Sequence, residues 1–484
     1  MSTDREPVII QGGMGVAISD WRLARAVSTA GQLGVVSGTA IEVVVARRLQ
    51  RGDPGGHVRR ALAHFPDPAV AAWILQAYFV DGGKGAARPF AAVPRWTLAP
   101  SQRLQELTVA AGFVEVFLAK EGHDGLVGIN FLRKIELPLP FALYGAMLAG
   151  VDRVLVGAGN PADLPGLVRS LAAHEPVAWS VRVQGSRSTD GDTAVEVRPS
   201  ALVPGAARPL DRPGVLAIVS SVDLAAGLAS DPATRPDGFV VEAPSAGGHN
   251  APPRGPRRVD DLGQPVYDER DVVDVPAIVA LGLPVWLAGS RGTPDGLRAA
   301  QSLGAVGVQV GTAFALCGDS GLDATLKARV LDQVAAGDVM VRADWRVSPT
   351  GFPFRVLSLP GTLSDPTVDA ARRRVCDLGV LRSPYRTDDG GIDYRCPAEP
   401  VDHYVRRKGG REANTEGRTC LCNALLASAG LPQSRPHGYV EPALVTAGTD
   451  FSPVERLMAA APDGRSYSAG DVVGFVLSEQ AALV

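Results

Sequence analysis

Eight short runs of Val, Ile, Leu and Ala constrain the fold of this chain more than any other feature. They span residues 7–13, 33–39, 126–132, 153–159, 215–221, 238–244, 285–291 and 307–313. Their apolar residues do not alternate with polar ones, which is typical of strands that are covered on both faces in a parallel sheet. Helical patterns lie between several runs. Ser19 or Asp20 can cap one helix, and Thr293 can cap another whose first residue is Pro294.

Eight parallel strands with intervening helices predict an α/β fold of the (β/α)8 TIM barrel type. An open, doubly wound sheet has the same local pattern, but its glycines would concentrate at one switch point. Here glycines recur after several strands, which favours the barrel. We predict a barrel over residues 1–320, with an insertion around 60–120 and a long connection over 160–212. Residues 321–484 form a C-terminal extension.

Composition excludes several functional classes. The chain carries 48 Lys and Arg against 51 Asp and Glu, and only 6% of its residues are aromatic. Neither a basic field nor stacking side chains are therefore available for nucleic acid. The N-terminus does not resemble a signal peptide, and no uncharged apolar window of about 18 residues could span a membrane. With five cysteines crowded mostly near the C-terminus, we expect a cytoplasmic protein.

A phosphate site is expected after the last two strands. Gly289 and Ser290 end the seventh run, and Gly311 and Thr312 end the eighth. This location is the usual phosphate site of TIM barrels, and the N-terminus of the helix after Thr293 favours an anion. The alternative is that these glycines only make tight turns.

His249 follows Gly247 and Gly248 at the end of the sixth run, so it should project into the barrel mouth. The two glycines leave room for a planar ligand, and an imidazole can exchange a proton near neutral pH. A structural histidine is the alternative, and it is our interpretation of the six other histidines.

These motifs resemble the nitronate monooxygenase (2-nitropropane dioxygenase) superfamily of flavin-dependent barrels. The resemblance rests on QGGMG near residue 13, Asn130, AGGH before residue 250, AGS near residue 289 and QVGTAF after residue 308. Longer segments such as VGINFLRKIELP, AGGHNAPPRG and CDLGVLR look like the trans-acting enoyl reductase branch. That branch serves polyketide and polyunsaturated fatty-acid synthases.

The resemblance implies FMN at the barrel mouth. Gly12, Gly13 and Met14 would run beside the ring edge, Asn130 would contact the flavin, and Gly247 and Gly248 would line the ring. Gly289, Ser290, Gly311 and Thr312 would hold the phosphate, while His249 would be the catalytic residue.

Four cysteines form a separate cluster in the extension. Cys376, Cys396, Cys420 and Cys422 have a spacing unlike that of zinc knuckles, although iron–sulfur sites accept looser spacing. We expect either a four-cysteine metal site, with zinc or an iron–sulfur cluster, or four buried thiols. The cluster would hold the extension as a cover over the barrel mouth.

Three functions are compatible with this sequence. The leading hypothesis is an enoyl reductase that uses FMN and NAD(P)H to reduce α,β-unsaturated thioesters on an acyl carrier protein. Arg407, Lys408 and Arg411 would be either a solvated loop or a docking patch for that carrier. The alternative enzyme is a nitronate monooxygenase that consumes oxygen, and the third hypothesis is a non-catalytic subunit of a synthase.

Overall fold

The eight predicted runs each contain a strand in the computed structural model, which describes residues 6–187, 190–205 and 208–478. These eight strands form one sheet, and their neighbours pair in parallel. In sheet order they are β1 (Ile9–Gln11), β11 (Gly307–Val310), β10 (Val285–Ala288), β8 (Gly238–Glu242), β7 (Gly214–Val219), β4 (Arg153–Gly157), β3 (Val127–Leu132) and β2 (Gly34–Ser37).

The sheet closes on itself between its two outer strands. The backbone N–H of Gln11 donates to the carbonyl of Leu33 at 2.9 Å, and the N–H of Leu33 donates to the carbonyl of Ile9 at 3.1 Å. Closure removes the exposed sheet edges, as a barrel requires. The predicted (β/α)8 barrel is therefore confirmed, and the open doubly wound sheet is wrong.

Side chains fill the inside of the barrel. A buried apolar cluster gathers inward-facing residues from six strands, and Trp286 is its largest member. The indole Nε1–H of Trp286 donates to the Pro7 carbonyl at 2.7 Å, so this buried polar atom is satisfied. The barrel interior is consequently a packed core, and the ligand space lies at its mouth.

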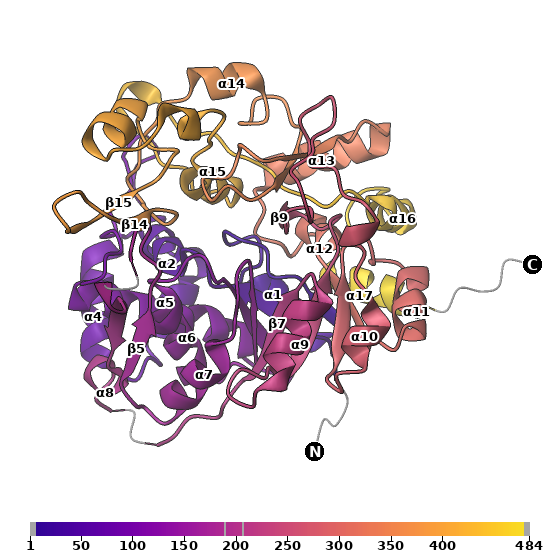
Figure 1. Ribbon diagram of the computed structural model, residues 1–484, viewed down its shortest axis with the longest axis horizontal. Coiled ribbons are helices and arrows are strands. Elements are labelled where there is room, and N and C mark those ends of the chain that lie inside the picture. The colour runs from indigo at the N-terminus through magenta and orange to yellow at the C-terminus, as the bar shows by residue number, and fades with distance from the viewer. Residues whose placement is uncertain (1–5, 188–189, 206–207, 479–484) are drawn as a thin grey trace, which may run out of the picture.

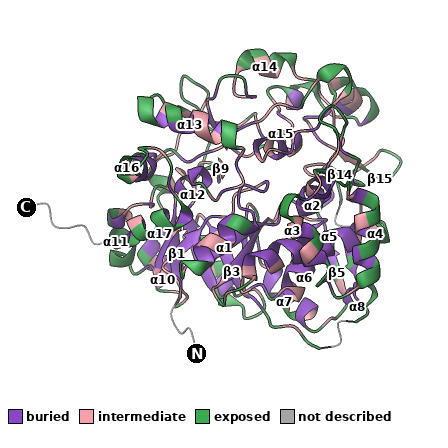
Figure 2. Cartoon of the chain, turned by 180° about the vertical axis from the view of Figure 1, so that it is seen from behind, coloured by how far each residue is buried: buried purple, intermediate pink, exposed green. Residues whose placement is uncertain are grey.

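Helices surround the barrel with their apolar faces inward, so the strands and the inner helix faces are buried (Figure 2). The Asp20 carboxylate caps α1 by accepting from the N–H of Arg22 at 2.9 Å. Asp20 is one of the two residues that the sequence offered for this cap. The helices that follow barrel strands include α1 (Trp21–Thr29), α2 (Ile41–Gln50), α6 (Leu139–Leu148), α7 (Leu164–Ala172), α9 (Val222–Ser230), α10 (Val275–Val279), α11 (Pro294–Ser302) and α12 (Thr312–Leu316).

The region around 60–120 adds helices α3 (His57–Leu62), α4 (Pro68–Tyr78) and α5 (Gln102–Lys120). Helix α5 packs against α6 at very short distance through two glycines. A Cβ on Gly145 would lie 1.8 Å from the Val109 carbonyl oxygen, and one on Gly112 would lie 2.2 Å from that of Ala142. The connection over 160–212 carries a hairpin of β5 (Val177–Ser180) and β6 (Ala194–Val197), followed by the short α8 (Pro199–Leu202).

The residues after the eighth strand contribute to the barrel's own core. Helices α13 (Ala324–Ala336), α16 (Ser452–Ala460) and α17 (Ala469–Leu477) bury Val330, Val454 and Val472 in the cluster that contains Ile9 and Leu23. Figure 1 shows α17 beside α11 at the flank of the barrel. The extension is thus partly integral to the barrel fold.

The rest of the extension lies over one end of the barrel (Figure 1). It comprises β12 (Val341–Asp344), β13 (Phe354–Leu357), α14 (Pro366–Ala371), β14 (Ser383–Arg386), β15 (Ile392–Arg395) and α15 (Leu421–Ser428). Strand β13 pairs antiparallel with β9 (Gly248–His249), which follows β8, and so ties this part to the strand ends. Across the described ranges, no helix combines the length and apolar character needed to cross a membrane.

Candidate active site

A cavity of about 250 Å³ lies between the carboxyl ends of the barrel strands and the extension. Ligand sites of TIM barrels occupy this end, because the loops after the strands converge there. The structure brings eleven sequence-predicted residues together in its wall: Gly12, Gly13, Met14, Asn130, Gly247, Gly248, His249, Gly289, Ser290, Gly311 and Thr312.

The loop after β1 is held in place by buried polar contacts. The Gln11 amide accepts from the Val35 N–H at 2.9 Å and donates to Ser19 Oγ at 2.7 Å. Ser19 Oγ in turn accepts from the N–H of Met14 at 2.8 Å. These bonds fix the stretch between β1 and α1 against β2, and the cavity wall there is consequently rigid.

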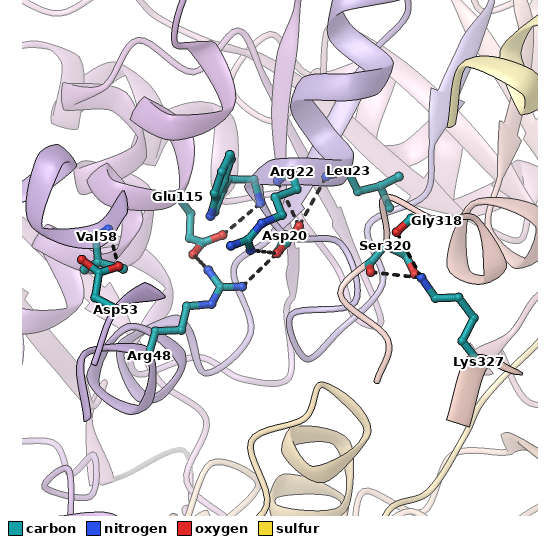
Figure 3. A network of polar contacts seen from close by, with 11 residues as sticks. Asp20, Arg22, Leu23, Arg48, Asp53, Val58, Glu115, Gly318, Ser320 and Lys327 are labelled. Atoms are coloured by element: carbon teal, nitrogen blue, oxygen red, sulfur yellow. Dashed lines mark hydrogen bonds and ion pairs between the residues drawn. The ribbon is translucent and has the colours of Figure 1, made fainter. Parts of the chain in front are cut away.

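An ion-pair network anchors the start of α1 behind this loop (Figure 3). The guanidinium of Arg48, on α2, lies 3.1 Å from the Asp20 carboxylate and also pairs with Glu115 on α5. Glu115 accepts from the Trp21 N–H at 3.1 Å. Burial raises the pKa of Glu115, and the Arg48 charge opposes that rise. Because Asp20 and Glu115 are both buried, Arg48 supplies the charge that makes their burial tolerable.

Gly13 and Asn130 meet across the cavity floor. The Asn130 Nδ2–H donates to the Gly13 carbonyl at 3.0 Å. A Cβ on Gly13 would lie 2.2 Å from Asn130 Cγ, so a larger residue cannot occupy this position without moving the loop. Asn130 Oδ1 is buried and has no hydrogen-bond partner among the residues that the structure describes, and the same is true of Oε1 of Gln309 on β11. Both residues line the cavity, where a bound ligand could satisfy these atoms.

The end of the cavity near β10 and β11 is suited to an anion. The backbone N–H groups of Ser290, Arg291 and Gly292 donate to no acceptor within the described part of the chain. Arg291 also lines the cavity and adds a positive charge. Helix α11 starts at Pro294 as predicted, with Thr293 Oγ1 accepting from the Gly296 N–H at 3.0 Å. Free amides and a guanidinium are what a phosphate requires.

His249 is bonded to the extension. Its Nε2 lies 2.7 Å from the Ser348 hydroxyl and 3.3 Å from that of Thr350. Its ring packs edge-on against Phe354, with 4.7 Å between the centroids. Burial lowers the pKa of His249 well below its usual value, and the nearby Lys134 charge adds to that effect. The imidazole is therefore neutral at neutral pH, in a position where it can donate or accept one hydrogen bond to a ligand.

Two half-buried charged residues were missed by the sequence analysis. Glu242, the last residue of β8, lines the cavity, and burial raises its pKa to about 7. Burial lowers the pKa of Lys134 to about 7, while the charge of Glu242 raises it. A carboxylate at the end of the apolar strand GFVVE was the signal that could have identified Glu242. Nothing in the local sequence indicates that Lys134 is buried.

The extension supplies part of the apolar wall, which the sequence analysis did not assign. Phe354, Val380, Leu381, Leu421, Leu425 and Pro453 all line the cavity. Near the anion end, the N–H of Gly448 donates to Thr312 Oγ1 at 2.9 Å. Residues of the extension therefore complete the site that begins at the ends of the barrel strands.

The predicted metal centre is not supported. Cys376, Cys396, Cys420 and Cys422 line one small cavity, but the described residues contain no group of three or more His, Cys, Asp or Glu that could hold a metal ion. Cys396 is buried, and the other three cysteines are half-buried. Neither zinc nor an iron–sulfur cluster is supported at these positions.

The basic cluster near residue 408 also differs from expectation. Lys408 is buried, and its Nζ lies 2.9 Å from the Glu399 carboxylate. It is therefore a structural cation and is not available to a docking partner, while Arg407 and Arg411 are exposed.

Comparison with known proteins supports the resemblance seen in the sequence. A family model described as nitronate monooxygenase matches residues 207–350, the segment that contains Glu242, His249 and Gly289. The resemblance to this superfamily is therefore confirmed over that segment. None of the curated proteins matches the chain significantly.

Solved structures with a similar arrangement include FabK from Thermotoga maritima, with 17% identity and a TM-score of 0.45 over 98% of this chain and 92% of that one. The enoyl reductase domain of MlnA from Bacillus amyloliquefaciens has 11% identity and a TM-score of 0.47, covering 97% and 93%. A nitroalkane oxidase from Streptomyces ansochromogenes has 15% identity and a TM-score of 0.35, covering 72% and 76%. Identities and TM-scores this low do not identify the function of this chain.

Proposed function

We propose that this chain is an FMN-dependent enoyl reductase that reduces α,β-unsaturated acyl thioesters with NAD(P)H. The observation that carries the proposal is the composition of one cavity. A glycine-rich floor, unsatisfied polar atoms and an anion-binding end lie opposite an apolar wall. The first three features suit a flavin nucleotide, and the fourth suits an acyl chain.

The residues present fit FMN. The unpartnered Asn130 Oδ1 and Gln309 Oε1 can bond the polar edge of a ring system, and Gly12, Gly13 and Gly248 leave its face free of side chains. The free N–H groups of Ser290, Arg291 and Gly292, with the Arg291 guanidinium, would hold the phosphate. FMN bound there would supply hydride transfer, which no side chain can provide.

The protein's own contribution is to position the thioester and to stabilise charge. Phe354, Leu381, Leu421 and Leu425 would hold the acyl chain and exclude water from the cavity. His249, neutral and oriented by Ser348, would donate a hydrogen bond to the thioester oxygen. Negative charge develops on that oxygen when hydride reaches the β-carbon, so a donor there lowers the barrier.

A nitronate monooxygenase is the second candidate, favoured by the family match over residues 207–350. In that case His249 would bind the nitronate, and oxygen would replace the nicotinamide. The cavity of about 250 Å³ has apolar side chains from both the barrel and the extension that suit an acyl chain, and we therefore rank this function second.

One pair of assays tests the proposal. Purified protein reconstituted with FMN should consume NADPH or NADH when crotonyl thioester is added under anaerobic conditions. It should consume little oxygen when a nitronate is added without nicotinamide, and the reverse result supports the monooxygenase. Protein that cannot be reconstituted with FMN supports a non-catalytic subunit.

We further propose that the physiological substrate is carried by an acyl carrier protein of a polyketide or fatty-acid synthase. Comparing crotonyl groups on a carrier protein and on free coenzyme A tests this part. A lower KM for the carrier-bound substrate is expected, and equal KM values contradict it.

A further inference from the structure

Glu242 lies between two cavities. Besides lining the large cavity, it lines a second one of about 20 Å³. The wall of the second cavity also includes Tyr267, Arg254 and Asp271. A space of this size is enough for one water molecule with polar partners. Arg254 is exposed, so this small polar cavity approaches the protein surface.

We propose that Glu242 is the proton donor of the reaction and that the small polar cavity supplies it with protons from solvent. This inference rests on the enoyl reduction proposed above. Hydride addition to the β-carbon leaves the α-carbon needing one proton. The O–H bond of the Glu242 carboxyl breaks, a C–H bond forms at the α-carbon, and a carboxylate remains. Water in the small cavity then returns a proton to Glu242.

The charges around Glu242 keep that carboxyl able to hold a proton near neutral pH. Burial raises its pKa to about 7, and the positive charge of Lys134 is the largest opposing influence. Lys134 Nζ is buried without a hydrogen-bond partner among the described residues and lies 4.1 Å from the Phe352 ring centroid. A carboxylic acid with a pKa near the working pH is the usual choice for general acid catalysis.

Other titratable groups face this carboxyl from neighbouring segments. His249 on β9 lines the large cavity with Glu242, and Arg254, Tyr267 and Asp271 line the small one. The charge of Arg355 on β13 acts on Tyr267. His249 is neutral at neutral pH, and burial raises the pKa of Tyr267 to about 12. Asp271 accepts hydrogen bonds from the Arg254 and Asp268 N–H groups. Around this carboxyl, the two groups whose pKa is shifted to about 7 are Glu242 and Lys134.

Lys134 is a positioning residue in this scheme, because it does not line the large cavity. Its charge lowers the pKa of Glu242, which places the protonation change of the acid near neutral pH. Removing the Lys134 charge should raise the pKa of Glu242. The conservative Lys134→Arg change keeps the charge and should leave that pKa unchanged.

The first test does not depend on turnover. Infrared difference spectra of the FMN-loaded protein, recorded between pH 5 and pH 9, should show a protonated carboxylic acid band that disappears through roughly pH 7. Burial raises the pKa of Glu42 to about 7 as well, so Glu42 contributes to the same band. The Glu242 component is the intensity that is lost in Glu242→Gln and retained in Glu42→Gln and in Glu196→Gln, whose exposed carboxylate lies on the β5–β6 hairpin. Full band intensity near pH 7 in Glu242→Gln overturns the proposal.

The second test separates the two half-reactions. Glu242→Gln should be reduced by the nicotinamide at the wild-type rate, whereas transfer to crotonyl thioester should slow by about 10²-fold or more. In wild type that second rate should fall as pH rises through about 7, since Glu242 loses its proton. In Lys134→Met this decrease in rate should occur at a pH higher by on the order of one unit. In Lys134→Arg it should occur at the same pH as in wild type.

The outcomes distinguish this inference from the proposed function. If wild type reduces no enoyl thioester, the proposed function fails, and the infrared band still reports whether Glu242 holds a proton. If wild type is active and Glu242→Gln transfers to the thioester at an undiminished rate, Glu242 is not the donor although the function stands.

Discussion

The Nε2 atom of His249 lies 2.7 Å from Oγ of Ser348, a fully buried side chain 99 residues further along the chain. Ser348 Oγ also lies 2.8 Å from Oγ1 of Thr350. The candidate catalytic imidazole thus belongs to the barrel, but its orientation is set by two hydroxyl groups of the extension. Such a partner fixes which imidazole nitrogen carries the proton.

Changing Ser348 to Ala should therefore weaken catalysis without loss of cofactor. The imidazole would keep only the longer contact with Thr350, at 3.3 Å, and would lose its orientation. We expect FMN content to be unchanged and thioester reduction to fall about 10-fold, which is close to the value of one hydrogen bond. Ser230→Ala, at an exposed hydroxyl at the end of α9, is the control. An unchanged rate in Ser348→Ala would show that His249 needs no such partner.

Substitution of His249 with Gln tests the imidazole directly. We expect FMN to remain bound and reduction of crotonyl thioester to fall by about 10²-fold or more, because the donor to the thioester oxygen is displaced. The rate of the wild type should show no titration of His249 between pH 6 and 8, since burial holds its pKa well below the usual value. Rapid-reaction kinetics with the reduced enzyme measure both the rate of thioester reduction in the variant and the pH dependence of that rate in wild type. Full activity of the variant would remove His249 from the mechanism.

Gly13→Ala should damage the flavin site while leaving the fold intact. The new Cβ would lie 2.2 Å from Asn130 Cγ, so either the loop or the Asn130 side chain must move. We expect FMN affinity to drop at least about 10-fold, equivalent to 1.4 kcal/mol. Fluorescence titration of the apoprotein with FMN measures this loss. The matched control is Gly474→Ala in α17, where the added Cβ meets no atom within 4 Å and where alanine should stabilise the helix. Equal affinity in both variants would contradict the close contact.

Replacing Arg48 with Met should destabilise the whole protein. Asp20 and Glu115 would keep their buried positions and lose the guanidinium that pairs with both. Breaking a buried ion pair by removing one partner costs about 3–5 kcal/mol. Urea denaturation at pH 7 should show that loss, whereas Arg406→Met, at an exposed guanidinium, should change stability little. A loss below about 1 kcal/mol would show that the network contributes little to stability.

The sequence by itself determined the barrel and most of the residues that gather at its mouth. Unbroken apolar runs bounded by glycine are typical of strands covered on both faces, and glycines at the carboxyl ends of parallel strands meet at one rim once the sheet closes. For this reason Gly247 and Gly289 could be assigned to one site from local pattern, whereas Gly12 and Asn130 were assigned from the resemblance to the superfamily.

Only the tertiary structure decided the chemistry of that site and its cover. Burial changes the properties of a side chain, and no local pattern indicates that Lys134 is buried near Glu242 or that Ser348 reaches His249. The cysteines show the same limit, because their spacing was compatible with a metal and the described structure holds no metal-binding group. Contacts between segments distant in sequence depend on how the extension packs, and that packing is a property of the whole chain.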